Sequence, residues 1–254
     1  MKFIWVLSGK KVKQFLVVLT AFLFTIGIVY TEKESITVFT NSDDPKALYS
    51  VNTKNKQVAL TFDISWGEEV PVPILNILDQ QGLKGKVTFF LSSPWSEKHQ
   101  DIVKRIADSG YEIGSHGHKH VNYSELTDQE IESQILKAES ILENLTGQKP
   151  TLIRTPNGDF DKRVLRIADR LGYTVVQWDT DSRDWMKPGV NEIVKRVTER
   201  VHPGDIILMH ASDSAKQSIE ALPIIIENLK KQGYTFVTVS ELISNAKINS
   251  TEVE

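Results

Sequence analysis

The stretch Val58-Ala59-Leu60-Thr61-Phe62-Asp63 is the part of the sequence on which the predicted fold depends. An almost unbroken apolar run that ends in a carboxylate is typical of a strand buried on both faces of a sheet. Pro71 to Gln81 then has the pattern of a helix, which Gly82 closes. Lys86 to Leu91 gives a second apolar strand. A strand, a helix and a second strand in this order predict neighbouring parallel strands of an α/β sheet.

The same alternation continues toward the end of the chain. The clearest helix begins at the capping box Thr127-Asp128-Gln129-Glu130, carries apolar residues along one stripe, and ends at Gly147. Seven strand–helix units are more than a small open sheet needs, so a closed or nearly closed barrel is expected. The other predicted strands are 111–114, 152–153, 174–178, 205–209 and 236–239, and the other predicted helices are 97–109, 161–171, 191–201 and 222–232, the last beginning near Pro223.

Composition limits the chemistry that is open to the chain. Its 254 residues carry a formal net charge of −3 and include no cysteine. This net charge does not indicate a nucleic-acid-binding protein. Without cysteine there is neither a disulfide nor a thiolate metal site. Any metal site must therefore use His, Asp and Glu side chains. The roughly 200 residues that follow the amino-terminal segment are enough for one domain with a full hydrophobic core.

The amino terminus is predicted to be a membrane anchor. Phe15 to Tyr30 contains no charged residue, and Lys10, Lys11 and Lys13 precede it. Lysines tend to stay in the cytoplasm, so the rest of the chain is expected on the outer side of the cell membrane. No Ala-x-Ala-like site follows Tyr30, which favours a retained anchor over a cleaved signal peptide. The predicted division is a cytoplasmic stub and anchor at 1–31, a spacer at 32–56, one domain at 57–246 and a polar tail at 247–254.

Polar side chains gather where the predicted strands end. Asp63 ends the first strand, Arg154 follows the fourth, Asp184 follows the fifth and His210 follows the sixth. The carboxyl ends of parallel barrel strands share one face, so these groups are expected at a single site. A lone Asp or His at such a position is more often a cap or a core group, whereas several at one end favour a functional site.

Three of the six histidines lie within residues 116–120, after the third predicted strand. His116 and His120 are four residues apart, so a helical turn or a tight turn would aim both imidazoles at one point. This is a common way to supply two nitrogen ligands to a divalent metal. His118 lies between them and is expected to be an exposed side chain that points elsewhere. A solvated polar loop is the alternative for this stretch taken alone.

Five short motifs occur in order along the chain: Thr61-Phe62-Asp63, His116-x-x-x-His120, Arg154-Thr155-Pro156-Asn157-Gly158, Asp181-Ser182-Arg183-Asp184-Trp185 and Leu208-Met209-His210. Together they resemble the motifs of the polysaccharide deacetylase, or NodB-homology, family over about residues 57–243. The membrane-anchored sporulation branch of PdaB-like proteins resembles the chain most closely. The resemblance implies a distorted (β/α) barrel of about seven parallel strands. It also implies metal-dependent removal of acetyl groups from an N-acetylated cell-wall glycan of the peptidoglycan type.

The resemblance further implies a catalytic set. It makes Asp63 the general base, Arg154 the partner that positions this base, His210 the general acid and Asp184 the carboxylate that tunes the histidine. Amide hydrolysis needs an activated water and a proton for the leaving amine, and an aspartate and a protonated histidine can supply both. A neighbouring carboxylate keeps an imidazolium populated near neutral pH.

The resemblance also implies a metal and a substrate pocket. It places zinc or a similar divalent ion on His116 and His120, where the ion would act as a Lewis acid on the acetyl carbonyl oxygen. Trp185, Leu208 and Pro156 would contact the substrate, the first two by lining the acetyl pocket.

Ile64 departs from the family pattern, in which a second aspartate usually stands here and completes an Asp-His-His metal triad. Isoleucine cannot coordinate an ion, and it is expected to stand near His116 and His120. The metal site is therefore expected to be weakened unless Glu68, Glu69 or a water fills the gap. Two functions remain open: a wall-glycan N-deacetylase, or a weakly active or inactive glycan-binding or scaffolding module on the same fold. The retained acid–base set favours the enzyme, because a binding groove alone does not need it.

Overall fold

The computed structural model describes Lys10, Lys13 and residues 45–251 of the chain, with side chains to residue 246. The predicted anchor, Phe15 to Tyr30, lies outside these residues and stays a prediction. In the described part, no helix is long and apolar enough to cross a bilayer. The described residues 45–251 belong to one compact unit, and this unit carries the predicted site.

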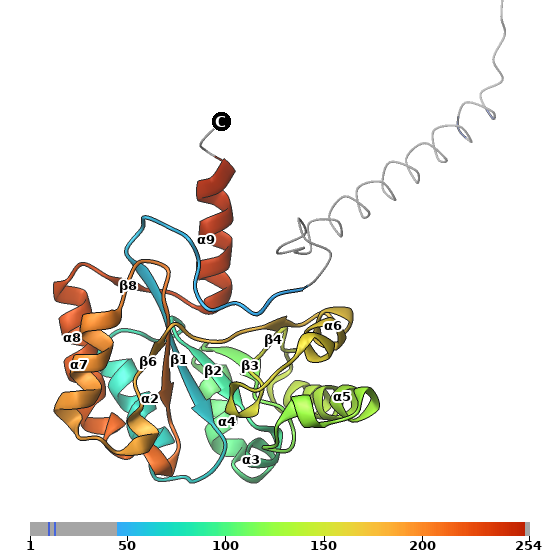
Figure 1. Cartoon of the computed structure of the whole chain (residues 1–254), viewed down its shortest axis with the longest axis horizontal. Coiled ribbons are helices and arrows are strands. Elements are labelled where there is room, and N and C mark those ends of the chain that lie inside the picture. Colours follow the sequence, from blue (N-terminus) through green and yellow to red (C-terminus); the bar gives the residue numbers. More distant parts are fainter. Residues whose placement is uncertain (1–9, 11–12, 14–44, 252–254) are drawn as a thin grey trace, which may run out of the picture. The chain divides into compact units, whose positions relative to one another are not determined.

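A curled parallel sheet is built around β1 (Gln57–Ile64), which confirms the strand predicted from the apolar run (Figure 1). The other strands are β2 (Thr88–Leu91), β3 (Glu112–Ser115), β4 (Leu152–Ile153), β5 (Thr174–Val175), β6 (Thr180–Asp181), β7 (Ile206–His210) and β8 (Thr235–Phe236). Their order is β5-β4-β3-β2-β1-β7-β6, every pair is parallel, and β8 pairs with the first residues of β1. The fold is the predicted distorted (β/α) barrel, in the form of a curled half-barrel.

The register of the central strands sets the position of two predicted site residues. Asp63 of β1 lies opposite His210 of β7. Along β1 the side chains alternate between two faces. Thr61 and Asp63 share one face, where both accept hydrogen bonds from Arg154, whereas Ile64 belongs to the main hydrophobic core.

Helices join the strands and cover the sheet (Figure 1). The predicted capping box begins α5 (Asp128–Thr146): Thr127 N–H donates to Glu130 Oε2 (2.9 Å), and Thr127 Oγ1 accepts from Glu130 N–H (3.4 Å). Gly147, with a φ of 72°, ends this helix as predicted. The other helices are α2 (Pro71–Gln80), α3 (Ser93–Lys98), α4 (Gln100–Asp108), α6 (Lys162–Arg170), α7 (Val190–Arg200), α8 (Ser218–Lys231) and α9 (Val239–Thr251), and the short 3-10 turns are η1 (Tyr123–Glu125), η2 (Pro156–Gly158), η3 (Asp184–Met186) and η4 (Asp213–Ala215).

Two helices differ from their predictions. The helix predicted at 97–109 is divided into α3 and α4 at His99, whose φ of −124° and ψ of 50° are not helical. Helix α8 begins at Ser218, so that Pro223 lies inside it and not at its start. Pro223 is the sixth residue of α8, so its missing N–H leaves one hydrogen bond of the helix unmade, while its fixed φ remains compatible with a helix.

The end of the chain also differs from its prediction. Of the run predicted as strand 236–239, only the first residue pairs, as part of β8, and α9 begins at Val239. The N–H of Val239 donates to the carboxylate of Glu112 (3.0 Å), which provides an acceptor at the helix start. Helix α9 continues to Thr251, into the segment predicted as a polar tail.

The amino-terminal part of the described domain fills the gap between β5 and β7. Leu48 forms a parallel bridge with Val176, and Ser50 forms an antiparallel bridge with Asp205. Leu48 and Val51 are buried. The run predicted as strand 174–178 is shorter in the sheet, where β5 covers 174–175. The Val176 N–H still donates to the carbonyl oxygen of Ile153 (2.8 Å), and the Gln177 N–H donates to that of Leu48 (2.7 Å). Residues 48–51, predicted as spacer, are therefore attached to the domain.

Candidate active site

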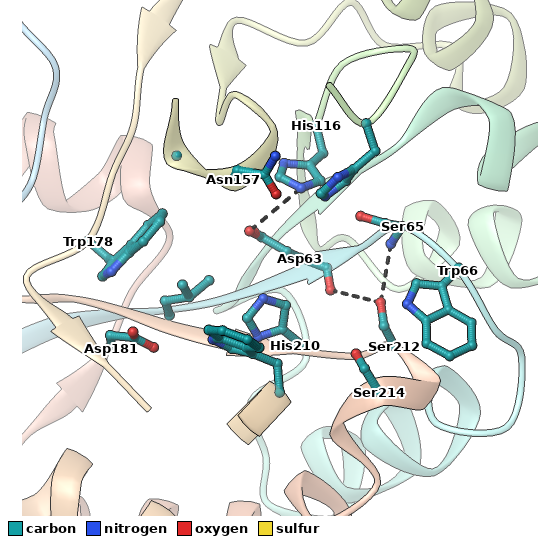
Figure 2. Close-up of a pocket in the computed structure, with 14 residues that line it drawn as sticks. Asp63, Ser65, Trp66, His116, Asn157, Trp178, Asp181, His210, Ser212 and Ser214 are labelled. Atoms are coloured by element: carbon teal, nitrogen blue, oxygen red, sulfur yellow. Dashed lines mark hydrogen bonds and ion pairs between the residues drawn. The ribbon is translucent and has the colours of Figure 1, made fainter. Parts of the chain in front are cut away.

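A pocket of about 660 Å³ opens at the carboxyl ends of the strands (Figure 2). Asp63 and His210 reach it from β1 and β7, and His116 and His120 reach it from the loop after β3. The lining also includes Ser65, Trp66, Asn157, Gly158, Trp178, Asp181, Trp185, Leu208, Ser212 and Ser214.

Arg154 is fully buried behind the pocket and fixes the carboxylate of Asp63. Its Nη1 donates to Asp63 Oδ1 (2.8 Å) and to Thr61 Oγ1 (2.9 Å). Burial would raise the pKa of Asp63, but the positive charge of Arg154, followed by His116 and His210, outweighs it and lowers this pKa below 3.8. Asp63 is therefore held as a carboxylate, with one oxygen engaged by Arg154 and the other, Oδ2, free for the pocket.

The hydrogen bond of His116 determines its tautomer. Nδ1 lies 2.8 Å from the carbonyl oxygen of Arg154, and because a carbonyl oxygen only accepts, Nδ1 carries the proton. Nε2 is left with a free lone pair, 3.9 Å from Asp63 Oδ2. Burial lowers the pKa of His116 to about 4, so the ring is neutral at physiological pH. The ring of His120 lies beside it, with 5.5 Å between centroids and an angle of 68° between planes.

Gly117 allows the chain to turn between these two histidines. Its φ is 74°, and a Cβ at this position would collide with the hydroxyl of Tyr123. His118 does not line the pocket, and its Nδ1 shares a hydrogen bond with Ser93 Oγ (2.9 Å). His118 is half-buried and partnered, so the expectation of an exposed side chain is wrong, although it does point elsewhere.

The two imidazoles fit part of a site for a divalent metal. A ring that donates Nδ1–H to a carbonyl oxygen and presents Nε2 is the usual arrangement of a metal-binding histidine. Over the described residues, no group of three His, Asp or Glu side chains is placed to hold an ion by itself. A third ligand would therefore be Asp63 after a small movement, a water or a substrate oxygen.

Ile64 does not face the pocket, which corrects the expectation that it stands near the histidines. It has no exposed surface, belongs to the main hydrophobic core and is absent from the pocket lining. Strand geometry is the reason, because β1 stays extended through residue 64 and turns this side chain to the face opposite Asp63. Glu68 and Glu69 are exposed and do not line the pocket either, so neither replaces the missing ligand.

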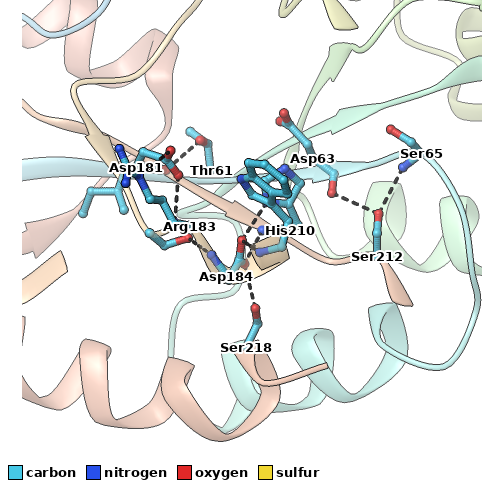
Figure 3. A network of polar contacts seen from close by, with 12 residues as sticks. Thr61, Asp63, Ser65, Asp181, Arg183, Asp184, His210, Ser212 and Ser218 are labelled. Carbon is cyan, nitrogen blue, oxygen red and sulfur yellow. Dashed lines mark hydrogen bonds and ion pairs between the residues drawn. The ribbon is translucent and has the colours of Figure 1, made fainter. Parts of the chain in front are cut away.

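His210 is paired with a buried carboxylate (Figure 3). Its Nδ1 lies 2.7 Å from Asp184 Oδ1. The other oxygen of Asp184 accepts from the Ser218 hydroxyl (2.6 Å) and from the backbone N–H of His210 (2.8 Å). Burial would lower the pKa of His210, but Asp184, with a smaller contribution from Asp63, raises it above 6.5. His210 can therefore carry a proton near neutral pH and present Nε2–H to the pocket.

Two of the three residues that the family resemblance implies as substrate contacts line the pocket. Trp185 and Leu208 line the pocket, whereas Pro156 is buried in η2 and does not. Asn157 and Gly158, the next residues of the same motif, line it instead. Asn157 has a φ of 59°, a left-handed conformation that asparagine tolerates better than most residues.

Two tryptophans of the lining were not identified from the sequence. Trp66 follows β1 and Trp178 follows β5, so both come directly after strands. The chain has only five tryptophans, and with Trp185 three of them lie at this pocket. The available signal was a rare, large side chain just beyond a strand end, where barrels of this kind place their sites.

Comparisons with known proteins agree with this geometry. Residues 50–176 match the family model described as Polysaccharide deacetylase. A peptidoglycan-N-acetylglucosamine deacetylase of Bacillus cereus is 37% identical over 193 residues, which cover 75% of this chain and 70% of that protein. The peptidoglycan-N-acetylmuramic acid deacetylase PdaA of Bacillus subtilis is 31% identical over 201 residues, which cover 78% of this chain and 75% of that protein. Among solved structures, a CE4 family pseudoenzyme from Bacillus anthracis matches with a TM-score of 0.74 and 35% identity, covering 78% of this chain and 69% of that one. The chain therefore belongs to the polysaccharide deacetylase family.

Proposed function

We propose that the protein hydrolyses the N-acetyl amide bonds of a peptidoglycan-type glycan and releases acetate. One observation carries this proposal: a carboxylate with a lowered pKa, Asp63, and an imidazole with a raised pKa, His210, face the same pocket. Two groups whose pKa values are pushed apart in this way can act as base and acid at one pH. The names of the Bacillus relatives, which specify N-acetylglucosamine and N-acetylmuramic acid deacetylases of peptidoglycan, support the substrate class.

Each of the four residues of the catalytic set then has a role in the hydrolysis. Asp63 Oδ2 takes a proton from the water that attacks the carbonyl carbon of the acetyl group, while Arg154 holds the other carboxylate oxygen in place. The tetrahedral intermediate breaks its carbon–nitrogen bond, and His210 Nε2 gives its proton to the leaving amine. Asp184 stabilises the imidazolium before this transfer. The products are acetate and a free amino sugar.

His116 and His120 are the residues that would hold a divalent ion such as zinc. Bound there, the ion would supply a Lewis acid for the acetyl carbonyl oxygen. The neutral ring and the free Nε2 of His116 support this assignment. Two imidazoles are fewer than the three protein ligands usual at a catalytic zinc, so the affinity should be lower than in enzymes with a full set.

We also propose that the domain acts outside the cytoplasm, held to the cell membrane by residues 15–30. The lysines ahead of this uncharged segment support the orientation. A wall glycan lies on the same side of the membrane. The resemblance of the sequence to the PdaB-like branch supports a role in modifying the cell wall during sporulation.

The second candidate function is a wall-glycan binding or scaffolding module with little or no turnover. Ile64 favours it, because no carboxylate stands at this position, and so does the similarity to a CE4 family pseudoenzyme. The enzyme accounts for more of the structure, because a binding module has no need for a buried carboxylate that charges His210.

Acetate release by the full-length chain in detergent, with N-acetylglucosamine oligosaccharides as substrate, tests the two candidates. We expect release that a metal chelator reduces. Asp63→Asn and His210→Ala should each lower kcat by about 10²-fold or more, the scale of lost general acid–base catalysis. Circular dichroism should show a retained fold, because the ring of His210 lines the pocket and the amide oxygen of Asp63→Asn can still accept the hydrogen bond from the buried Arg154.

Three results would contradict the proposal. Turnover within a few-fold of the parent for either variant would mean that the base and the acid are other residues. Oligosaccharide binding without acetate release by the parent would favour the binding module. Zinc content that is unchanged in a His116→Ala variant would show that the metal does not bind in this pocket.

A further inference from the structure

Trp66 is a large aromatic side chain that the fold leaves exposed beside the pocket. Its surface is 56% exposed, and it lines the pocket together with Ser212 and Ser214. Within the described part of the chain, no hydrogen bond or ring contact involves its side chain. The nearby Trp95 is different: it is buried and donates Nε1–H to the carbonyl oxygen of Gly67 (2.7 Å). The loop is therefore held by Trp95, and the indole of Trp66 is not needed for packing.

The loop that carries Trp66 is fixed on both sides of it. Before it, the N–H of Ser65 donates to Ser212 Oγ (3.2 Å). After it, the carboxylate of Asp213 accepts hydrogen bonds from the N–H groups of residues 68–70 (3.2, 3.0 and 3.1 Å). The exposed indole is thus carried by an ordered loop, and a ligand that binds it has little loop entropy to remove.

Trp66 and Trp178 lie on opposite sides of the proposed acid and base. In Figure 2, Trp66 is beyond Ser212 on one side of Asp63 and His210, and Trp178 is on the other side. Trp66 follows Asp63 by three residues, so their Cα atoms are at most about 10 Å apart. This distance is comparable to the length of a disaccharide. The pocket therefore extends past the reacting centre in both directions.

We propose that Trp66 is the stacking platform of a second sugar subsite. It would bind a pyranose ring next to the sugar whose N-acetyl group lies between Asp63 and His210. A pyranose ring presents a face of C–H groups, which packs on the electron-rich face of an indole, and hydroxyl groups at its edge, which suit the neighbouring Ser212 and Ser214. The ligand is then a polymer of N-acetylated sugars and not a single sugar. This inference takes its ligand class from the proposed function, but it does not depend on turnover.

Calorimetric binding of N-acetylglucosamine oligosaccharides tests the subsite, with the full-length chain in detergent. The monosaccharide N-acetylglucosamine, which can fill only the reacting site, and a hexasaccharide are compared on the parent, Trp66→Ala, Trp66→Phe and Tyr49→Ala. Tyr49 is the matched control, because it is an exposed aromatic residue outside the pocket lining. We expect Trp66→Ala to raise the hexasaccharide Kd at least about fivefold and the monosaccharide Kd by less than about twofold. Trp66→Phe should keep most of the affinity, and Tyr49→Ala should bind as the parent does.

The outcomes separate the subsite from the proposed function. Hexasaccharide binding by Trp66→Ala that equals the parent's would overturn the subsite, and so would an equal loss of affinity for the monosaccharide and the hexasaccharide. A parent that does not bind the hexasaccharide would overturn it too. If Trp66→Ala loses affinity for the hexasaccharide alone and the parent releases no acetate, the subsite is supported and only the deacetylase activity is contradicted. The Tm of Trp66→Ala should match that of the parent, because the side chain is mostly exposed. If the Tm is lower, the hexasaccharide affinity of Trp66→Phe is the deciding measurement, and a Phe variant that folds and loses this affinity would contradict the subsite.

Discussion

Asp184 sets the charge of His210 from a fully buried position. Hydrogen bonds from Ser218 and from the His210 backbone hold its carboxylate, so it cannot turn away from the ring. Burial lowers the pKa of His210 and the charge of Asp184 more than offsets this, leaving the pKa above 6.5. The imidazolium is therefore present below the raised pKa and is lost as the pH rises through it.

Asp184→Asn should lower the pKa of His210, because the amide keeps the size of the side chain and removes its charge. Proton NMR titration, with the His210 signal assigned from His210→Gln, should give a midpoint above 6.5 in the parent and a lower one in the variant. The basic limb of an acetate-release profile should move to lower pH in the same direction. Asp179→Asn removes a carboxylate from His202 (3.0 Å) instead and should leave His210 unchanged. Equal midpoints in the parent and Asp184→Asn would show that Asp184 does not tune the ring.

Ile64→Asp should destabilise the fold and should not complete a metal site. The new carboxylate would lie in the hydrophobic core, where Ile64 has no exposed surface. The loss of apolar contacts and the burial of a polar group together should cost about 3 kcal/mol or more, compared with about 1 kcal/mol for Ile64→Val. Urea unfolding with and without zinc measures both. A variant as stable as the parent, or one that zinc stabilises more than it stabilises the parent, would mean that residue 64 reaches His116.

The main site residues could be predicted because parallel strands bring their carboxyl ends to one face. Asp63 and His210 stand at strand ends in the sequence, and both line the pocket. The direction of Ile64 could not be predicted, because it depends on whether β1 stays extended for one residue past Asp63. The exposed position of Trp66 could not be predicted either, because its loop is ordered by Asp213, which is far away along the chain.

At the scale of elements, the amino terminus of α2 is capped by a residue of another loop. Its N-cap residue, Val70, has no side chain that can accept a hydrogen bond. Asp213, which follows β7, accepts from the N–H groups of residues 68–70 instead. The carboxylate satisfies the N–H of the N-cap residue Val70 and two N–H groups of the loop before it, and it interacts favourably with the helix dipole. The same contact joins the loops after β1 and β7, which both line the pocket.

Asp213→Ala should therefore affect both stability and binding. Loss of the cap should cost about 1–2 kcal/mol of unfolding free energy, and release of the loop should weaken hexasaccharide binding through Trp66. Asp161→Ala is the matched control, because Asp161 caps α6 by accepting from Arg163 N–H (2.8 Å) and Val164 N–H (3.0 Å) and does not line the pocket. Denaturant unfolding should give similar losses for both variants, and calorimetry should separate them. Equal hexasaccharide affinities would mean that Asp213 does not hold the loop.

Elements with local signals could be predicted, and those that depend on distant contacts could not. Helix α5 has a capping box and a terminal Gly147, and the structure confirms both of these local signals. Strand β6 has two residues, Thr180 and Asp181, which are too few for a periodic pattern, and it is not among the predicted strands. Helix α9 begins where Val239 meets Glu112, a contact between residues 127 positions apart. No local pattern shows such a contact.

At the scale of the whole molecule, the segment that leads into the domain is also part of it. Residues 48–51 form bridges to both sides of the gap in the half-barrel, and Leu48 and Val51 are buried there. The predicted spacer thus ends before residue 48 and not at residue 56. A fragment that begins at residue 51 would lose the Leu48 bridge and expose apolar surface, so solution work on the isolated domain should start before this segment.

The predicted membrane topology can be tested with single cysteines, because the chain has none of its own. Lys54→Cys places one at an exposed position of the domain, and Lys10→Cys places one ahead of the uncharged segment at 15–30. If the lysines stay in the cytoplasm, a maleimide that cannot cross membranes should label Lys54→Cys in intact protoplasts and Lys10→Cys only after lysis. The reverse pattern would contradict the orientation, and labelling of neither before lysis would place the domain inside. A retained anchor also predicts that the labelled Lys10→Cys and Lys54→Cys chains have the same mass, whereas cleavage after Tyr30 would separate the Lys10→Cys label from the domain.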